Sequence, residues 1–217
     1  ELFADGERAF TYDNLLRGDH LEYITMRSGN GSEVRKNVVD GDFIRNFDML
    51  SSGDSRGAIL DNTVAGGAFL SDEKVEVTGD YAIMTGNVMY GRFAAQTGFL
   101  VAGNSNLVRL NEISADFSNR VKFKADTDRM DMERNDIEGK FLLNTYIADI
   151  SPQNDTGSNL LLDNAIDVRR GMFLDIFTYG SNDTVLQDNT VKGENMTHIS
   201  VGATGRSNRV ADNVVSG

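Results

Sequence analysis

The sequence predicts an all-β fold, a parallel β-helix or solenoid in which one chain winds through about eight similar coils, here called rungs, of about 25 residues. Two observations predict it: an Asn recurs at intervals of 23 to 29 residues, and the residues around each Asn keep the same register. A repeat of this length is typical of a solenoid, because each rung can bury its apolar face only against the next. The nine copies are Asn14, Asn37, Asn62, Asn87, Asn111, Asn135, Asn164, Asn189 and Asn213.

The residues that flank each Asn predict what it does. The third residue before it is apolar in every copy from Asn37 onward, the second residue after it is always apolar, and the fourth after it is Gly except at Ala115 and Val168. We expect the Asn to mark a bend between two strands, because Asn tolerates the left-handed backbone region. Stacked Asn side chains should bond one another as a ladder. The Gly should close the next bend, where positive φ or close approach is needed.

Each rung contains three short runs of alternating apolar residues, which we predict as three strands separated by turn residues. In the first complete rung they cover residues 24–27, 32–36 and 38–40. The first strand recurs at residues 47–50, 75–78, 99–102, 121–124, 146–150, 174–177 and 199–202. One rung carries an insertion at 151–157 with the only proline, Pro152, which predicts a surface loop.

Composition bounds the organisation of the chain. Its 217 residues form one predicted domain, 1–217, and we expect a piece of a longer protein that lacks its natural caps. Cysteine is absent, so neither disulfides nor thiolate metal sites contribute. No apolar run approaches the about 20 residues of a spanning helix, and we therefore expect no membrane insertion.

The charge of the chain limits the classes of partner that we expect. The formal net charge is -12 and the sequence pI is about 4.5. Nucleic acid is excluded as an expected partner, because its binding depends on phosphate contacts from Lys and Arg. A solvated acidic surface explains the charge, and cation binding is the alternative.

The repeat as a whole resembles the right-handed parallel β-helix of the pectate-lyase-like superfamily, and phage tailspike β-helices share the same pattern. The resemblance covers essentially the whole chain and implies a single-stranded right-handed parallel β-helix with an Asn ladder. By analogy with such scaffolds, it implies a polysaccharide partner and an extracellular, cell-surface or virion-surface location.

Outward side chains of one strand should form columns along the stack, with neighbours about 4.8 Å apart. Alternation on the first strand of each rung predicts two such columns of outward side chains, side by side. The first is Thr25, Asp48, Glu76, Leu100 and Lys122, with Tyr146, Asp175 and Ser200 as its continuation. The second is Arg27, Leu50, Thr78, Ala102 and Lys124. The predicted catalytic residues are Arg27, Asp48, Glu76 and, further along, Lys122.

The chemistry expected of this face follows from its residue types. Two carboxylates about 5 Å apart, Asp48 and Glu76, suit a retaining glycoside hydrolase, with one as acid and one as nucleophile. Arg27 would bind a substrate carboxylate with its planar fork. Ordinary surface charge is the other explanation. The residues imply no definite cofactor; a Ca²⁺ ion at the same carboxylates is an alternative, although calcium takes six or more oxygen ligands.

A narrower resemblance covers Ile24 to Asn30, which is similar to the arginine-bearing rung of the chondroitinase B and alginate lyase family. The resemblance implies that Arg27 neutralises a uronate or acts as an acid. Ser28 replaces the His of the family pattern, and the catalytic Lys that should lie one rung earlier has no counterpart in residues 1–4.

Two functions of different class therefore stand as expectations. One is a protein that binds or degrades an acidic or cell-surface polysaccharide, with lyase or hydrolase chemistry if it is an enzyme. The other is a non-catalytic structural or receptor-binding shaft, as in a phage tailspike or a secreted adhesin. A homotrimer in solution would favour the shaft, and a monomer would favour the enzyme.

Overall fold

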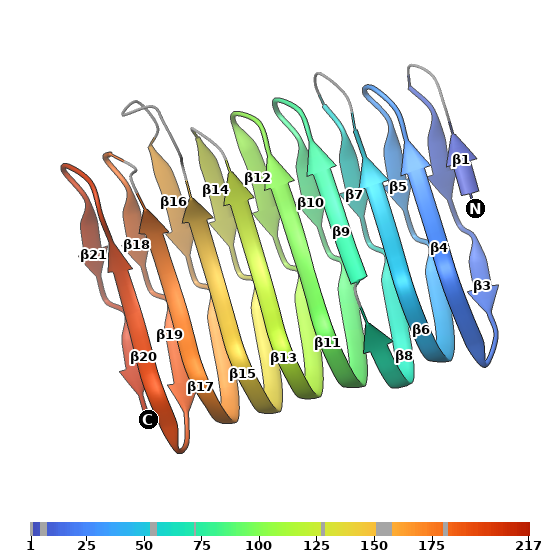
Figure 1. Ribbon diagram of the computed structural model, residues 1–217. Coiled ribbons are helices and arrows are strands. Elements are labelled where there is room, and N and C mark those ends of the chain that lie inside the picture. Colours follow the sequence, from blue (N-terminus) through green and yellow to red (C-terminus); the bar gives the residue numbers. More distant parts are fainter. Residues whose placement is uncertain are drawn as a thin grey trace.

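The computed structural model is a parallel β-solenoid of about eight rungs, which confirms the predicted fold class (Figure 1). The structure describes residues 2–4, 8–52, 56–71, 73–126, 129–150, 158–179 and 182–217. Within these residues every regular element is a strand, and every pairing between strands is parallel. The strands of the described residues form one sheet of 13 and one of nine.

The 13-stranded sheet, here called the long sheet, contains the longest strands. It consists of β1 (Leu2–Ala4), β3 (Leu15–Arg17), β4 (His20–Ser28), β6 (Val38–Ser51), β8 (Thr63–Ser71), β9 (Glu73–Thr78), β11 (Val88–Ala102), β13 (Glu112–Asp126), β15 (Asp136–Ile150), β17 (Ala165–Tyr179), β19 (Thr190–Gly193), β20 (Met196–Ala203) and β22 (Val214–Ser216). The short sheet consists of β2 (Phe10–Tyr12), β5 (Glu33–Arg35), β7 (Ala58–Leu60), β10 (Ile83–Thr85), β12 (Asn106–Arg109), β14 (Met130–Glu133), β16 (Asn159–Leu162), β18 (Val185–Gln187) and β21 (Arg209–Ala211).

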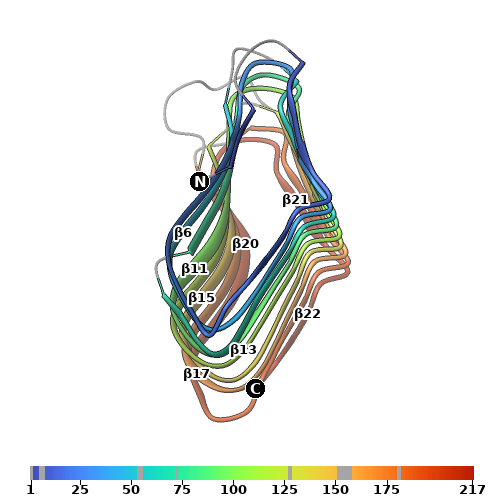
Figure 2. The ribbon, with the colours of Figure 1, turned by 90° about the vertical axis from the view of Figure 1, so that its right-hand side faces the viewer.

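The prediction of three separate strands per rung is confirmed where β3 and β4, β8 and β9, and β19 and β20 are distinct strands. In most rungs the predicted third strand and the next first strand are one continuous strand, such as β6 over Val38–Ser51. Seen along the stack, each long strand passes around the bend at the lower end of the cross-section in Figure 2. Pairing with the neighbouring rungs continues around this bend, with a register shift where β11 meets β8 between Gly91 and Phe93. Because the pairing continues through the bend, the recurrent Gly that was expected to close it lies within one strand, as Gly41 does in β6.

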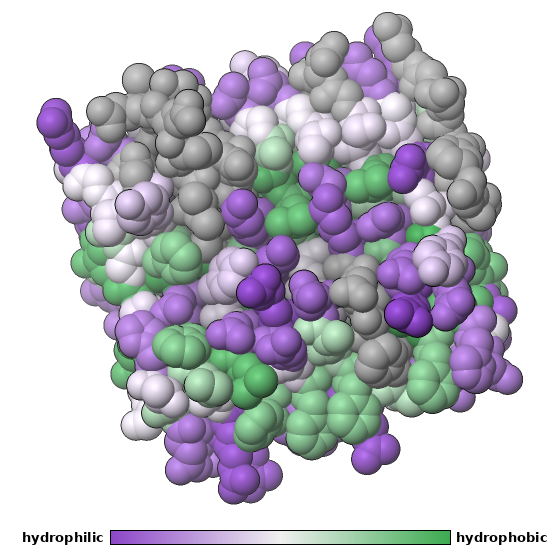
Figure 3. All heavy atoms as spheres, in the orientation of Figure 1, coloured by the Kyte–Doolittle hydropathy of each residue, from purple (hydrophilic) through white to green (hydrophobic). Residues whose placement is uncertain are grey.

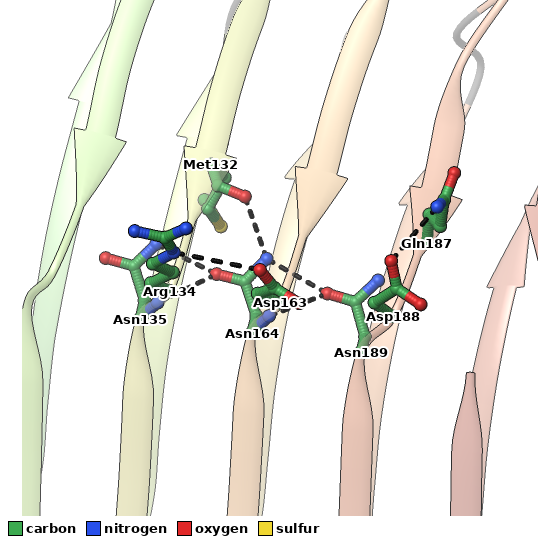
Figure 4. A network of polar contacts seen from close by, with 8 residues as sticks. All are labelled: Met132, Arg134, Asn135, Asp163, Asn164, Gln187, Asp188 and Asn189. Atoms are coloured by element: carbon green, nitrogen blue, oxygen red, sulfur yellow. Dashed lines mark hydrogen bonds and ion pairs between the residues drawn. The ribbon is translucent and has the colours of Figure 1, made fainter. Parts of the chain in front are cut away.

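The Asn ladder is present and its amides are satisfied on both sides. Figure 4 shows three of its members, Asn135, Asn164 and Asn189. Asn164 donates from its Nδ2 to the Oδ1 of Asn189 at 3.0 Å and to the carbonyl oxygen of Met132 at 2.8 Å. Its own Oδ1 accepts from the backbone and side-chain N–H groups of Asn135 at 3.0 and 2.9 Å. Because these amides are buried, the ladder rigidifies the core only as long as each amide keeps its partners.

The left-handed residue at this bend is the one before each Asn, which corrects the expectation that it is the Asn itself. Asp61, Leu110 and Asp163 have φ of 55°, 55° and 54°. The recurrent Gly after the Asn is not explained by a positive φ either. A Cβ on Gly139 would lie 2.5 Å from the carbonyl oxygen of Ala115, so close approach between rungs excludes a side chain there.

The core fills the space between the two sheets with aliphatic, Met and Phe side chains. Met26, Met49 and Met84 are fully buried, as their inward positions predict. The long strands also point small polar residues inward, at Ser28, Ser51, Thr97, Thr145 and Thr178. Asn106 is buried as well, and its Oδ1 accepts the backbone N–H of Ala82 at 2.7 Å.

Candidate functional site

The candidate site is a groove on the outer face of the long sheet, where one column of outward residues crosses the middle rungs. The observed pairs are Thr25 with Asp48, Asp48 with Lys74, Lys74 with Gly98, Gly98 with Lys122, Lys122 with Tyr146, Tyr146 with Asp175, and Asp175 with Ser200. The strands place these side chains at intervals of about 4.8 Å on a rigid surface.

A gap in the column forms the centre of the groove. Gly98 has no side chain, and the side chain of Lys122 lies across it, since a Cβ on Gly98 would be 2.6 Å from the Lys122 Cγ. Lys74 and Arg120 line the same hollow, which has a volume of about 350 Å³. The hollow is therefore surrounded by three cations from β9 and β13.

The electrostatics of the groove are opposite to those of the chain as a whole. Burial lowers the pKa of Lys122 below its usual value, and the nearby charges of Arg120, Lys124 and Lys74 lower it further. Lys74 is paired with Glu76 at 2.5 Å. Among the described residues, Lys122, Arg120 and Lys124 form no ion pair. In a chain with net charge -12, these cations form a local positive site that an anion would relieve.

A second hollow of about 450 Å³ continues the groove over β15 and β17. Arg120 is shared by both hollows, and Tyr146, Phe173 and Asp175 line the second one. Burial raises the pKa of Tyr146, while the charge of Arg120 acts in the opposite direction. The hydroxyl of Tyr146 therefore stays protonated at neutral pH and can donate a hydrogen bond.

Asp175 lies at the end of this part of the groove, and two side chains contact its carboxylate. The Nε2 of His198 lies 3.2 Å from the Asp175 Oδ1, and the Ser200 hydroxyl donates to the same oxygen at 2.5 Å. The groove therefore contains, in order, a cationic section and a section of hydrogen-bonding groups.

The register of the structure corrects the predicted columns. Glu76 lies opposite Leu50 and Leu100, whereas Asp48 lies opposite Lys74. The predicted acid pair is thus offset by two residues, which places the two Cα atoms about 8 Å apart instead of about 5 Å. A slip of two residues keeps every side chain on its face, so alternation cannot detect it. The continuation of the Lys122 column through Tyr146, Asp175 and Ser200 is confirmed.

The four predicted catalytic residues do not converge. Arg27 is exposed on β4, Asp48 is on β6, Glu76 is on β9 and Lys122 is on β13. Four strand intervals, or about 19 Å, separate β4 from β13, so only Lys122 lines the groove. In the described part of the chain no three acidic or His side chains converge as a metal site.

Comparison with known proteins adds no relative. No protein-family model matches the chain, and neither the curated proteins nor the solved structures contain a match. None of the described secondary structure is a helix of the length and apolarity needed to cross a lipid bilayer. Fold and groove together define the class: a parallel β-solenoid with a cationic groove on its long sheet. The resemblances to the pectate-lyase-like superfamily and to the lyase family remain predictions.

Proposed function

We propose that this solenoid binds an anionic polysaccharide along the groove, with Lys122 and Arg120 holding its carboxylates. The observation that carries the proposal is the gathering of Lys74, Arg120 and Lys122 around the gap at Gly98, with the charge of Lys124 close to Lys122, in a chain of net charge -12. Arg binds a carboxylate with two parallel hydrogen bonds, and Lys adds a mobile point charge.

The shape of the groove supports a polymer as the ligand. Its two hollows are continuous at Arg120 and extend across β9, β11, β13, β15 and β17 of one rigid sheet. In the second hollow, Tyr146 and Asp175 can form hydrogen bonds with the hydroxyl groups of a sugar chain. In the first hollow, the cations can bind its acidic groups. Nucleic acid fits less well, because its denser phosphate charge would be repelled by the acidic remainder of the surface.

The direct test is a titration of the protein with an oligouronate and with a neutral oligosaccharide of the same length. We expect binding of the oligouronate alone, and at least a tenfold loss of affinity in Lys122→Gln and in Arg120→Gln. Lys192→Gln is the matched control, because Lys192 is exposed on β19 outside the groove. Equal affinity of all four proteins for the oligouronate would refute the proposal.

The same titration tests the residues predicted from sequence. Arg27→Ala, Asp48→Asn and Glu76→Gln should change affinity less than Lys122→Gln, because none of them lines the groove. The reverse order would return the site to the N-terminal rungs. An assay for unsaturated products and new reducing ends on the same samples separates lyase and hydrolase chemistry from binding alone. Binding without turnover, in a trimer, would favour the shaft.

A further inference from the structure

A column of Phe side chains runs along the outside of the bend in the long sheet. Each of its members follows the ladder Asn of its rung by six residues, and strand pairing places three of them in direct register on consecutive strands. The column, here called the Phe column, consists of Phe93, Phe117 and Phe141, with Phe43 at the equivalent position of β6.

The rings of the Phe column pack against one another through their faces. The rings of Phe93 and Phe117 are stacked, with centroids 5.1 Å apart and planes 16° apart, and Phe117 and Phe141 follow at 6.2 Å and 37°. Phe93, Phe117 and Phe141 remain 44%, 43% and 40% exposed. Because the faces are occupied, the column presents ring edges to solvent, which suit an apolar partner better than the face of a sugar ring.

A shallow apolar hollow of about 290 Å³ lies along these rings. Phe93, Ala95, Phe117, Phe141 and Leu143 contribute to its lining. Figure 3 shows a band of hydrophobic side chains along the lower part of the long strands, below a zone rich in hydrophilic side chains. Apolar patches of a few hundred Å² on a protein surface are often functional.

The apolar hollow and the cationic groove lie side by side on the same rungs. Arg120 follows Phe117 by three residues on β13, or about 10 Å along the strand. Asn119 lines the apolar hollow, and its neighbour Arg120 lines both hollows of the groove. An apolar strip is therefore bordered directly by the cations that the proposed function uses.

The width of the strip decides which occupant fits. Four exposed Phe side chains of about 200 Å² each, at about 40% exposure, leave roughly 350 Å² of apolar area. A stable dimer buries about 800 Å² on each partner. A charged column borders the strip on its other side, with Arg92, Asp116 and Lys140. The strip is thus one side chain wide and linear, which fits a single alkyl chain better than a second copy of the protein.

We propose that the ligand is an anionic glycan that carries an acyl chain, with the chain along the Phe column and the acidic sugar on Lys122 and Arg120. The inference rests on the proposed function and specifies its ligand as an amphiphile. An anionic membrane surface is the weaker candidate, because the net charge of -12 opposes approach to it.

The test compares dodecyl glucuronide, methyl glucuronide and dodecyl maltoside, each below its micellar concentration, by direct titration and by displacement of bound oligouronate. We expect dodecyl glucuronide to bind at least tenfold more tightly than either of the others and to displace the oligouronate. Phe117→Ser, and separately Phe141→Ser, should remove the advantage of the alkyl chain and keep oligouronate affinity. Tyr90→Ser is the matched control, since Tyr90 is 45% exposed on β11 outside the column.

The outcomes separate this inference from the proposed function. Binding of oligouronate with equal affinity for dodecyl and methyl glucuronide would overturn the inference and leave the function standing. Binding of dodecyl glucuronide that depends on Phe117 and Lys122, without any binding of oligouronate, would support the amphiphile and overturn the polysaccharide. No binding of any probe would overturn both. Concentration-dependent dimerisation that Phe117→Ser abolishes would assign the column to a second copy and overturn the inference.

Discussion

In the groove, Lys122 on β13 lies directly across Gly98 on β11. A Cβ on Gly98 would be 2.6 Å from the Lys122 Cγ and 2.8 Å from the Lys122 carbonyl oxygen. The first contact is with a flexible side chain, but the second is with the backbone. The hollow between the cations therefore depends on the absence of a side chain at one position. This relationship joins the strand pairing of the solenoid to the function that we propose.

Gly98→Ala should therefore destabilise the protein by about 1–3 kcal/mol, because the added methyl group overpacks against the neighbouring strand. It should also weaken oligouronate binding by moving Lys122. Gly202→Ala is the control: a Cβ there meets nothing within 4 Å, so removal of backbone freedom from the unfolded chain should stabilise by about 0.4–1 kcal/mol. Thermal melts and titrations measure both effects. Similar melting temperatures for the two variants would contradict the close approach.

The Asn ladder should carry a large share of the stability. Asn87→Leu or Asn111→Leu strands buried partners on both neighbouring rungs, at about 1–3 kcal/mol for each unsatisfied group. Asn87, for example, donates to the Asn111 Oδ1 and to the carbonyl oxygen of Ile59, both at 2.9 Å.

Asn104→Leu is the matched control for the ladder variants, because the Asn104 side chain is exposed in a turn. Denaturant unfolding should place it near the wild type, well above both ladder variants. Equal stabilities for the two kinds of variant would rule out the ladder as a source of stability.

The pH dependence of stability should show one carboxyl group in particular. Burial raises the pKa of Asp136 to about 6, and the charges of Glu138, Glu112 and Asp167 add to the shift. Because the folded state binds this proton more tightly than the unfolded chain, Asp136 destabilises the protein at pH 7. Its contribution to the free energy of unfolding improves as the pH falls from about 6 toward 4.

Asp136→Asn should remove this penalty and raise the stability at pH 7. The full shift of about two pKa units corresponds to about 3 kcal/mol, which solvent screening of this half-exposed group reduces to about 1 kcal/mol. Melting curves from pH 4 to 8 should show a smaller gain on acidification in the variant than in the wild type. Glu22→Gln, an exposed residue paired loosely with Arg45, should leave the profile unchanged. A wild-type profile in Asp136→Asn would refute the assignment.

The fold was predictable from sequence because the ladder is local: one Asn and its apolar neighbours recur in every rung. The site was less predictable, because it depends on register between rungs. Ser51 and Thr97 point inward, although their polarity suggests solvent, and this hides the third inward position of each long strand. Without that position, Val75 is matched to Phe47 instead of Met49, and Lys74 is lost from the column.

The Phe column, in contrast, was visible in the sequence and was missed. Phe43, Phe93, Phe117 and Phe141 each follow a ladder Asn by six residues, which is a regular signal. Alternation counted from Val39 and Gly41 assigns Phe43 to the core, whereas the structure has two consecutive outward residues at the bend, Asp42 and Phe43. This break in the alternation arises from the tertiary bend of the strand, and the sequence pattern does not show it.

Engineered disulfides would test the register directly, because the chain has no cysteine of its own. Asp48 lies opposite Lys74, and Glu76 lies opposite Leu50, on neighbouring strands. At the strand spacing of about 4.8 Å, both pairs lie within the 4.4–6.8 Å range of Cα separations that disulfides bridge, whereas Asp48 and Glu76, about 8 Å apart, lie outside it.

We expect Asp48→Cys with Lys74→Cys, and Leu50→Cys with Glu76→Cys, to lose both free thiols on mild oxidation. Asp48→Cys with Glu76→Cys should keep them. Thiol titration and intact mass measure the result, and closure of the third pair alone would restore the register predicted from sequence and with it the acid pair.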